Sequence, residues 1–354
     1  MTIFNSKNER VKRDYVEYLR HADGKAEPTI RQVEKAILRF EAFTGFADFS
    51  TFNQQVARCF KEDLAKQNLA KATTLSTVTA VKRFFGWLAM QPGYKRKISL
   101  TDVDYLSLSD KDVRAAKAPA DKAYPSLEQI ERVLNTMPGD TPIEKRDRAL
   151  IAFTILTGIR DGAMVTLRLK HIDVERRLVV QDPNEVATKS GKRIDSFFFP
   201  VGGPVEQIVI DWVRYLRQGL LFGDDDPLFP KSEMSHDENK CFISISLTRE
   251  FWSGAGQVRS IFKAAFERAG LPAFTPHSFR RTVVSEMYRR GLSVSQCKAW
   301  SQNLGHEGAM TTLTSYGKLS LEEQGRLVHK SSRTREEQPL TRTQLEDILS
   351  QRGL

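Results

Sequence analysis

The feature of this sequence that most constrains its fold is an interruption in the apolar pattern. Residues 92–124 carry alternating charges and small side chains, as in PGYKRK and KDVRAAKAPADKAYP, whereas both flanking regions repeat apolar residues at helical spacing. A stretch without apolar periodicity has little to bury, so it is typical of an exposed connection between domains. We therefore predict two domains, at residues 1–95 and 125–332, joined by a linker at residues 96–124.

The N-terminal region predicts a small helical bundle. Ser6 and Glu9 have the spacing of a capping box and precede a segment whose apolar side chains share one face. Further apolar segments follow Pro28 and occupy roughly residues 53–68 and 72–90. Four helices in so short a region can bury one another's apolar faces as a bundle.

The region after the linker predicts a domain of mixed secondary structure. Ser126 is placed to cap a helix, and the apolar segment DRALIAFTILTGI predicts a helix that ends near Gly158. Residues 172–200 have the composition of β-strands, with a Ser-Gly pair at the tip of a hairpin. From residue 204 the pattern is helical again, interrupted by a loop with the sequence GDDDPLFPKSEMSHDENK. We predict a mainly α chain whose second domain is α+β and contains a small antiparallel sheet.

Charge favours a polyanionic partner. The chain has 54 Lys and Arg against 44 Asp and Glu, a net charge of +10, and residues 1–120 hold 21 basic and 14 acidic side chains, net +7. Nucleic acid is the leading partner class, and an anionic membrane surface is the second. No apolar run approaches the roughly 20 residues that span a bilayer, and the N-terminus lacks the apolar core of a signal peptide. We predict a cytoplasmic, nucleoid-associated protein without membrane contact.

The three cysteines do not suggest a metal site. They are far apart, and the sequence has no C-x-x-C motif. Neither a disulfide framework nor a zinc site fits such spacing. We predict that the cysteines are reduced packing residues and that the protein needs no metal or other cofactor.

Six separated residues could carry chemistry: Arg160, Lys189, His277, Arg280, His306 and Tyr316. Each alone has an ordinary structural explanation, such as a helix cap, a surface ion pair or a packing tyrosine. His277 and Arg280 stand one helical turn apart, so their side chains can reach the same point. The informative signal is the order and spacing of the whole set.

In this order, the six residues resemble the active-site signature of the tyrosine recombinases, also called phage-type integrases. The segments LTGIRDGAMVTLRLKHID, TPHSFRRTVVSEMYRRG and NLGHEGAMTTLTSY are similar to the family segments around the first arginine, the second box and the nucleophile. The helix STVTAVKRFFGWL looks like part of the family's core-binding domain. The resemblance covers the chain up to about residue 330 and implies a SAM-like helical core-binding domain followed by a catalytic domain.

One position departs from the family pattern. The family usually has an acidic residue three positions after the first arginine, and this chain has Ala163 there. The acid normally supports its neighbours without touching the substrate, so its absence concerns rate or rigidity more than the type of reaction. Asp161 is the candidate substitute.

The resemblance implies phosphoryl transfer to a tyrosine. Arg160 and Arg280 would hold the non-bridging oxygens of the scissile phosphate, which planar guanidinium groups match well. Tyr316 would attack the phosphorus, giving a 3′-phosphotyrosyl bond and a free 5′-hydroxyl. This covalent bond conserves the phosphodiester energy, so strand exchange needs no ATP and no metal. The chain has no G-x-x-x-x-G-K-[ST] or G-x-G-x-x-G loop, and its run Asp224–Asp226 reads as a solvated loop.

The resemblance also assigns the proton transfers. His277 would act as general base on the tyrosine, and His306 would hydrogen-bond the scissile phosphate. Lys189 would donate the proton to the departing 5′ oxygen, since the pKa of a lysine moves readily near other cations. Lys192, in the same hairpin, is the alternative.

The same organisation predicts how duplex DNA is bound. Two domains joined by a linker can close around a duplex as a clamp, with basic side chains neutralising phosphates. The predicted DNA contacts are Lys82 and Arg83, as a pair facing a groove, and Arg281, Arg289 and Arg290, at the backbone. A solvated face is the competing interpretation.

The C-terminal tail predicts an interaction between protomers. Residues 333–354 begin as a polar linker and end in a short helix, where Thr343 and Glu346 have capping-box spacing. The apolar stripe of this helix is too small to be stable alone. In the family such a segment commonly docks on a neighbouring protomer. We predict docking in trans within a cyclic homotetramer on two DNA duplexes; packing of the tail on its own domain, or fraying, is the competing interpretation. Accessory DNA-bending or directionality proteins are the further predicted partners.

The leading interpretation is a site-specific recombinase that integrates, excises or resolves a DNA element. A type IB topoisomerase uses similar chemistry but would relax supercoils as a monomer without sequence demand. A DNA-binding protein without catalysis would keep the basic surfaces and tolerate loss of Tyr316. The intact set of six residues argues against this last alternative.

Overall fold

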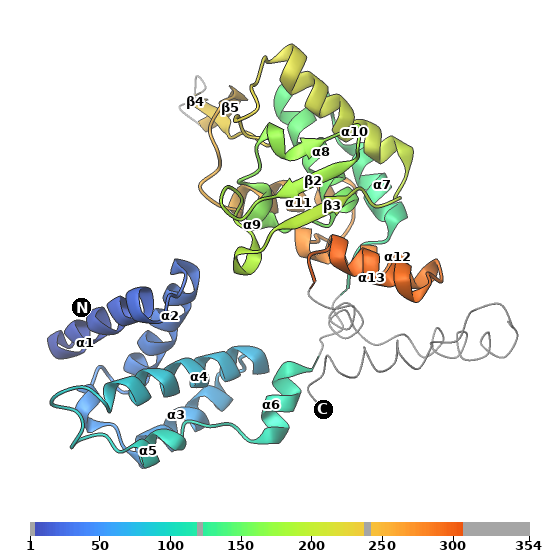
Figure 1. Cartoon of the computed structure of the whole chain (residues 1–354). Helices are drawn as coiled ribbons and strands as arrows, with labels where there is room; N and C mark the ends of the chain where they lie inside the picture. The colour runs from blue at the N-terminus through green and yellow to red at the C-terminus, as the bar shows by residue number, and fades with distance from the viewer. Residues whose placement is uncertain (1–3, 119–122, 237–241, 307–354) are drawn as a thin grey trace, which may run out of the picture. The chain divides into compact units, whose positions relative to one another are not determined.

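The computed structural model describes residues 4–118, 123–236 and 242–306 (Figure 1). The chain divides into two compact units, Met1–Ala118 and Pro119–Leu354. None of the helices in the described ranges is both long and apolar enough to cross a bilayer.

The first unit is a helical bundle with an aromatic core. Helix α2 packs along α4, where the rings of Phe40 and Phe85 lie 4.9 Å apart. Phe85 also stacks on Phe52 with 3.9 Å between centroids. The helices are α1 (Ser6–Glu17), α2 (Glu27–Phe43), α3 (Gln54–Lys66), α4 (Lys71–Leu88), α5 (Leu100–Asp104) and α6 (Asp110–Lys117), with a π turn η1 (Tyr18–Ala22) and a 3₁₀ turn η2 (Phe49–Thr51). The predicted helical bundle is confirmed.

The cap of the first helix differs from the sequence prediction. Helix α1 begins at Ser6, and the residue before it, Asn5, accepts hydrogen bonds from the backbone N–H groups of Lys7 and Asn8. Asparagine is as good an N-cap as serine. The capping-box spacing of Ser6 and Glu9 therefore pointed to the right helix but to the wrong cap.

Part of the predicted linker is helical. Helices α5 and α6 lie within residues 96–124, and each begins after a serine cap, Ser99 or Ser109. Val103 and Leu106 are almost fully buried in the core of the first unit. So few buried residues produce no recognisable period, which is why the pattern did not reveal these helices. The first unit thus extends beyond residue 95.

The second unit contains seven α-helices and five strands within the described ranges. The helices are α7 (Leu127–Thr136), α8 (Pro142–Thr157), α9 (Asp161–Met164), α10 (Gly203–Arg214), α11 (Gly256–Arg268), α12 (Pro276–Arg289) and α13 (Val294–Asn303). The strands are β1 (Ile172–Asp173), β2 (Leu178–Gln181), β3 (Ile194–Phe197), β4 (Ser232–His236) and β5 (Phe242–Leu247). Short helical turns are η3 (Leu169–His171), η4 (Lys189–Gly191) and η5 (Tyr215–Gly219).

Helix α8 is the centre of this unit. Residues 149–157 are all buried, and α10 and α12 pack on them. Thr141 and Glu144 form a capping box at one end, and Gly158 ends the helix in the left-handed conformation at φ 60°. Ser126 caps α7 as predicted. The apolar segment predicted to end near Gly158 is confirmed as a buried helix.

A small antiparallel sheet carries one edge of the site described below. Its order is β1-β2-β3, with Val179 opposite Ser196 between β2 and β3. The turn η4 lies in the β2–β3 loop, residues 182–193, and α13 packs against β3 (Figure 1). The mainly α fold with a small antiparallel sheet is confirmed.

A second hairpin was not predicted. Strands β4 and β5 pair antiparallel with a register shift between Glu233 and Met234. The sequence SEMSH of β4 has no apolar alternation and lay inside the predicted loop. Pairing of its backbone with the more apolar β5 accounts for the strand.

Candidate active site

Four of the six predicted residues come from three places in the second unit that are far apart in sequence. Arg160 lies between α8 and α9, and His277 and Arg280 lie near the start of α12. His306 follows α13. Both arginines are close enough to both histidines to lower their pKa values. The fold therefore brings these four side chains to one site.

Gly158 makes the close approach at this site possible. Its φ of 60° is a conformation that glycine adopts without strain. A Cβ atom on this residue would lie 2.5 Å from Cδ2 of Leu304. The turn before Arg160 therefore packs directly against the segment that leads to His306.

Arg280 ties these segments together. It is only 2% exposed, and its guanidinium donates to the carbonyl of Gly158. Nη2 also donates to the carbonyl of Leu304 at 2.6 Å and contacts Nε2 of His306 at 2.8 Å. Because arginine has only donors, Nε2 of His306 must accept, and the ring carries its proton on Nδ1.

Both histidines are kept neutral near pH 7. Loss of hydration is the largest cause that lowers the pKa of His306 to about 4, and Arg280, Arg160, Lys189 and His277 lower it further. The pKa of His277 is lowered by desolvation of its ring and then by the two arginines, although the residue as a whole is exposed. A neutral imidazole can accept a proton, which a general base must do.

The position of His306 is set by the junction of α13 with β3. Asn303 accepts a hydrogen bond from the backbone N–H of Phe197 at 2.6 Å and donates to its carbonyl at 2.8 Å, so its side chain pairs with β3 much as a strand would. Gly305 follows with φ 67°, and a Cβ there would lie 2.6 Å from Cδ1 of Ile194. Sequence reasoning missed Asn303, since its partner is 106 residues away. A glycine just after a helix is a recognisable signal for Gly305.

Both candidate lysines lie in the β2–β3 loop. Lys189 opens the turn η4 and is exposed, and its charge contributes to the lowered pKa of His306. Lys192 lines a cavity of about 480 Å³ together with Ile194, Asn303 and His306. The geometry therefore brings the loop to the site and leaves both lysines as candidates.

The departure at position 163 has a structural explanation. Ala163 is 2% exposed and belongs to the apolar core. Asp161 forms an ion pair with Arg259 of α11, with Oδ2 at 2.9 Å from Nε and 2.8 Å from Nη2. Sequence reasoning missed Arg259, which lies 98 residues away from its partner.

The acidic run of residues 224–226 does not form a metal cage. Asp224 pairs with Arg217 at 2.9 Å, and Asp226 pairs with Arg249 at 3.0 Å. Asp225 contacts Lys170 at 2.9 Å. Each of these three carboxylates thus pairs with a lysine or arginine side chain. No group of three or more metal-ligating side chains occurs in the described ranges.

The basic residues in and just after α12 that are predicted to contact DNA have contacts within the protein. Arg289 forms a bidentate ion pair with Glu286, at 2.9 Å and 2.6 Å. Arg290 donates to the carbonyl of Pro200 at 2.7 Å. Arg281 lies beside the site and contributes to the lowered pKa of His277.

The two predicted contact residues of the first unit differ in setting. Lys82 is bonded to Asp104 at 3.0 Å and to the hydroxyl of Ser107 at 2.8 Å. Arg83 is more exposed and contacts Asp23 at 3.7 Å. It also lines a groove of about 490 Å³ between α2 and α4. The basic side chains that line this groove are Lys25, Lys35, Arg39 and Arg83, and the hydroxyl side chains are Thr73, Ser76, Thr77 and Thr79.

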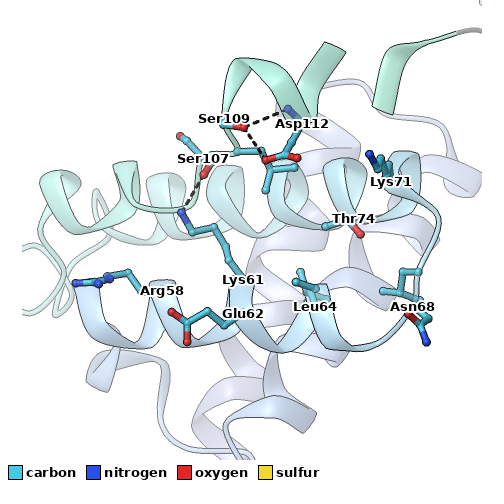
Figure 2. Close-up of a pocket in the computed structure, with 13 residues that line it drawn as sticks. Arg58, Lys61, Glu62, Leu64, Asn68, Lys71, Thr74, Ser107, Ser109 and Asp112 are labelled. Atoms are coloured by element: carbon cyan, nitrogen blue, oxygen red, sulfur yellow. Dashed lines mark hydrogen bonds between the residues drawn. The ribbon is translucent and has the colours of Figure 1, made fainter. Parts of the chain in front are cut away.

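A larger cavity of the first unit is separate from these residues. Its volume is about 650 Å³. Figure 2 shows it between α3 and the start of α6. Lys61 donates to the carbonyl of Ser107 at 3.0 Å on one wall, and Ser109 caps α6 on another. None of the site residues predicted from the sequence lines it.

Three predictions lie outside the described residues. They are the position of Tyr316, the capping box of Thr343 and Glu346, and the docking of residues 333–354.

Comparisons with known proteins identify the family of this chain. The profile described as the phage integrase family matches residues 126–323, more than half of the chain. The chain is 26% identical over 258 residues to the tyrosine recombinase XerC of Roseiflexus castenholzii, covering 72% of this chain and 70% of that protein. It is 24% identical over 281 residues to the tyrosine recombinase XerD of Vibrio cholerae, covering 78% and 76%.

Solved structures share the fold. The integrase of the Tn1549 transposon in complex with transposon right end DNA has a TM-score of 0.59 at 17% identity, covering 91% of this chain and 99% of that one. A lambda integrase dimer bound to a COC′ core site has a TM-score of 0.59 at 14% identity, covering 88% and 96%. The chain therefore belongs to the phage integrase family of tyrosine recombinases, whose reaction is the breakage and rejoining of DNA strands.

Proposed function

We propose that this chain is a site-specific recombinase that cuts and rejoins duplex DNA through a 3′-phosphotyrosyl intermediate on Tyr316. The observation that carries the proposal is the site around Arg280, where two guanidinium groups lie beside two neutral imidazoles. A phosphoryl transfer needs positive charge at the phosphorus and groups that accept and donate protons. This site supplies both.

The chemistry follows from these groups. Arg160 and Arg280 stabilise the charge on the non-bridging oxygens while the tyrosine oxygen of Tyr316 forms a bond to phosphorus and the bond from phosphorus to the 5′ oxygen breaks. His277 takes the proton of the tyrosine. Lys189 gives its proton to the departing 5′ oxygen, with Lys192 as the alternative donor.

His306 has a separate part in this proposal. Its Nε2 accepts from Arg280, so the remaining ring donor is Nδ1–H. This proton is the group that would bond to the phosphate. The contact with Arg280 thus fixes both the orientation and the tautomer of the ring.

Duplex DNA is the proposed partner, and the solved relatives bound to DNA support it. The groove between α2 and α4 presents Lys35, Arg39 and Arg83 beside Thr and Ser hydroxyls. Basic and hydroxyl side chains are the usual donors to phosphate oxygens. We assign backbone binding by the first unit to this groove, and by the second unit to Arg281, Arg289 and Arg290.

The assembly on DNA is proposed as a cyclic homotetramer holding two duplexes, with the tail docked on a neighbouring protomer. Deleting residues 338–354 should abolish tetramer formation on paired DNA sites, measured by gel shift and light scattering. Unchanged assembly would contradict docking of the tail.

The decisive experiment traps covalent protein–DNA adducts in cells and sequences the attached DNA. Wild-type protein should give adducts at one defined junction, and Tyr316→Phe should give none. Tyr105→Phe is the matched control, because Tyr105 is exposed on the first unit and should leave adducts intact. Adducts scattered without sequence preference would favour a topoisomerase, and absence of wild-type adducts on bound DNA would contradict catalysis.

A further inference from the structure

The β2–β3 loop is fixed to the body of the second unit by an acidic side chain that the proposed chemistry does not use. Glu185 receives two charge-assisted contacts: from Nζ of Lys170 to Oε1 at 2.8 Å and between Nε2 of His171 and Oε2 at 2.7 Å. Both donors belong to η3, the turn before β1. The carboxylate thus connects the loop to a segment outside it.

His171 can hold this contact in only one tautomer. The ring is 5% exposed, and its Nδ1 accepts from the backbone N–H of Arg168 at 3.0 Å. Its proton is therefore on Nε2, directed at Glu185. The hydrogen bonds from Lys170 and His171 hold the pKa of Glu185 at about 2. The carboxylate stays charged at any pH used to assay DNA cleavage.

The residues after Glu185 carry this constraint toward Lys189. Val186 is buried in the core at 2% exposure, and the backbone N–H of Ala187 donates to Oγ1 of Thr166 at 2.9 Å. The backbone N–H of Thr188 donates to the carbonyl of Val186 at 2.7 Å. Its hydroxyl, however, is buried without a hydrogen-bond partner among the described residues. A buried hydroxyl without a partner is unfavourable, so contacts elsewhere in the loop must hold this conformation.

We propose that Glu185, held by His171 and Lys170, is a positioning residue that fixes where the β2–β3 loop presents Lys189 to the scissile phosphate. The inference rests on the proposed function, in which Lys189 donates the proton to the 5′ oxygen. Lys189 follows the anchored residues 185–188 directly, and its own side chain is exposed. Its place relative to His306 is therefore determined by the anchor upstream.

A first experiment tests the anchor without DNA. Glu185→Gln keeps the shape of the side chain and removes its charge, whereas Glu175→Gln removes a charge from an exposed turn before β2 and serves as the control. Hydrogen exchange by mass spectrometry should show residues 182–193 exchanging on the order of tenfold faster in Glu185→Gln, with the rest of the unit unchanged. Unchanged exchange in this loop would overturn the proposal.

A second experiment tests the catalytic consequence. The substrates are the junction recovered by adduct sequencing, with either the natural 5′ oxygen or a 5′ sulfur at the scissile phosphate. A thiolate leaves without a proton, since a thiol has a pKa of about 8.5. Glu185→Gln should cleave the oxygen substrate about 100-fold more slowly than wild type, and it should cleave the sulfur substrate at nearly the wild-type rate. Equal losses on both substrates would mean a merely structural role and would overturn the proposal.

Reference variants separate this inference from the proposed function. Lys189→Ala should show the same rescue by sulfur as Glu185→Gln, and Glu175→Gln should match wild type on both substrates. If the 5′-sulfur substrate restores cleavage by Lys192→Ala and not by Lys189→Ala, the proposal that Glu185 positions Lys189 is overturned, while the recombinase chemistry remains. Failure of the wild-type protein to cleave either substrate would contradict both the proposed function and this inference.

Discussion

Replacing Gly305 with alanine should destabilise the second unit, because the backbone and the packing both oppose a side chain there. The residue has φ 67°, and a Cβ atom would lie 2.6 Å from Cδ1, 3.0 Å from Cγ1 and 3.1 Å from Cγ2 of Ile194. Ile194 is a 7% exposed residue of β3 and has little room to move. The same change would push His306 away from Arg280, so DNA cleavage should fall as well.

The expected loss of stability has two parts. A left-handed conformation costs a non-glycine residue about 1 to 2 kcal/mol. Overpacking a core contact by one methyl group costs about 1 to 3 kcal/mol. We therefore expect Gly305→Ala to lower the free energy of unfolding by about 2 to 5 kcal/mol.

Gly291 provides a matched control. It has φ 63°, and a Cβ atom there would have nothing within 4 Å. Gly291→Ala should therefore cost only the conformational part, about 1 to 2 kcal/mol. Urea unfolding followed by tryptophan fluorescence measures both, since Trp212, Trp252 and Trp300 belong to the second unit.

A double mutant isolates the clash. Ile194→Val removes Cδ1, the atom nearest to the added methyl group, and Gly305→Ala should cost at least about 0.5 kcal/mol less in that background. If Gly305→Ala costs no more than Gly291→Ala, or if Ile194→Val brings no relief, the close packing of this turn against β3 is refuted.

Four further predictions test other features of the second unit. Asn303→Leu should lower the free energy of unfolding, measured in urea, by about 1 to 3 kcal/mol, because it leaves the backbone N–H and C=O of Phe197 in β3 without these partners. A smaller loss than that of an exposed Asn→Leu control would contradict the pairing. Arg146→Met should lower the free energy of unfolding by about 3 to 5 kcal/mol, because Arg146 is 1% exposed and pairs with Asp147 at 2.7 Å. Burial raises the pKa of Asp147, and the loss should be largest above that pKa, where the aspartate is charged and has lost its partner. The pH at which cleavage falls to half should lie below 6.5, the ordinary pKa of a histidine, because desolvation and the neighbouring arginines lower the pKa of His277; half-loss at or above pH 6.5 would contradict this. The free energy of unfolding of the second unit should decrease as the pH is lowered from 6.5 to about 4, because His306 binds a proton in this range in the unfolded state but not in the folded state. His306→Gln should reduce this pH dependence in urea unfolding.

Local patterns predicted most of the fold because they depend on neighbouring residues. Ser126 caps α7 as the sequence indicates, and the apolar segment before Gly158 is a buried helix. The pattern failed where burial involves few residues, as in α5 with Val103, or where a strand is defined by its partner, as in β4. In these elements tertiary pairing decides the structure.

The structure brings four of the six predicted residues together, but the sequence did not reveal the geometry of the site. The spacing of His277 and Arg280 indicates a common face, yet it does not tell that the histidine is exposed and the arginine is 2% exposed. The bond of Arg280 to Gly158 joins residues 122 apart in sequence. Such contacts depend on how α8, α12 and α13 pack, which no local period encodes.

The structure also explains how this chain accommodates alanine where an acid is usual. A carboxylate at Ala163 would be placed in the apolar core, where an unpaired charge is costly. Asp161 instead lies at the start of α9, where Arg259 orients its carboxylate from α11. Its charge raises the pKa of His277, against the lowering by Arg280 and Arg160. Asp161 therefore acts on the proposed base through electrostatics, from a position that avoids burying a charge in the core.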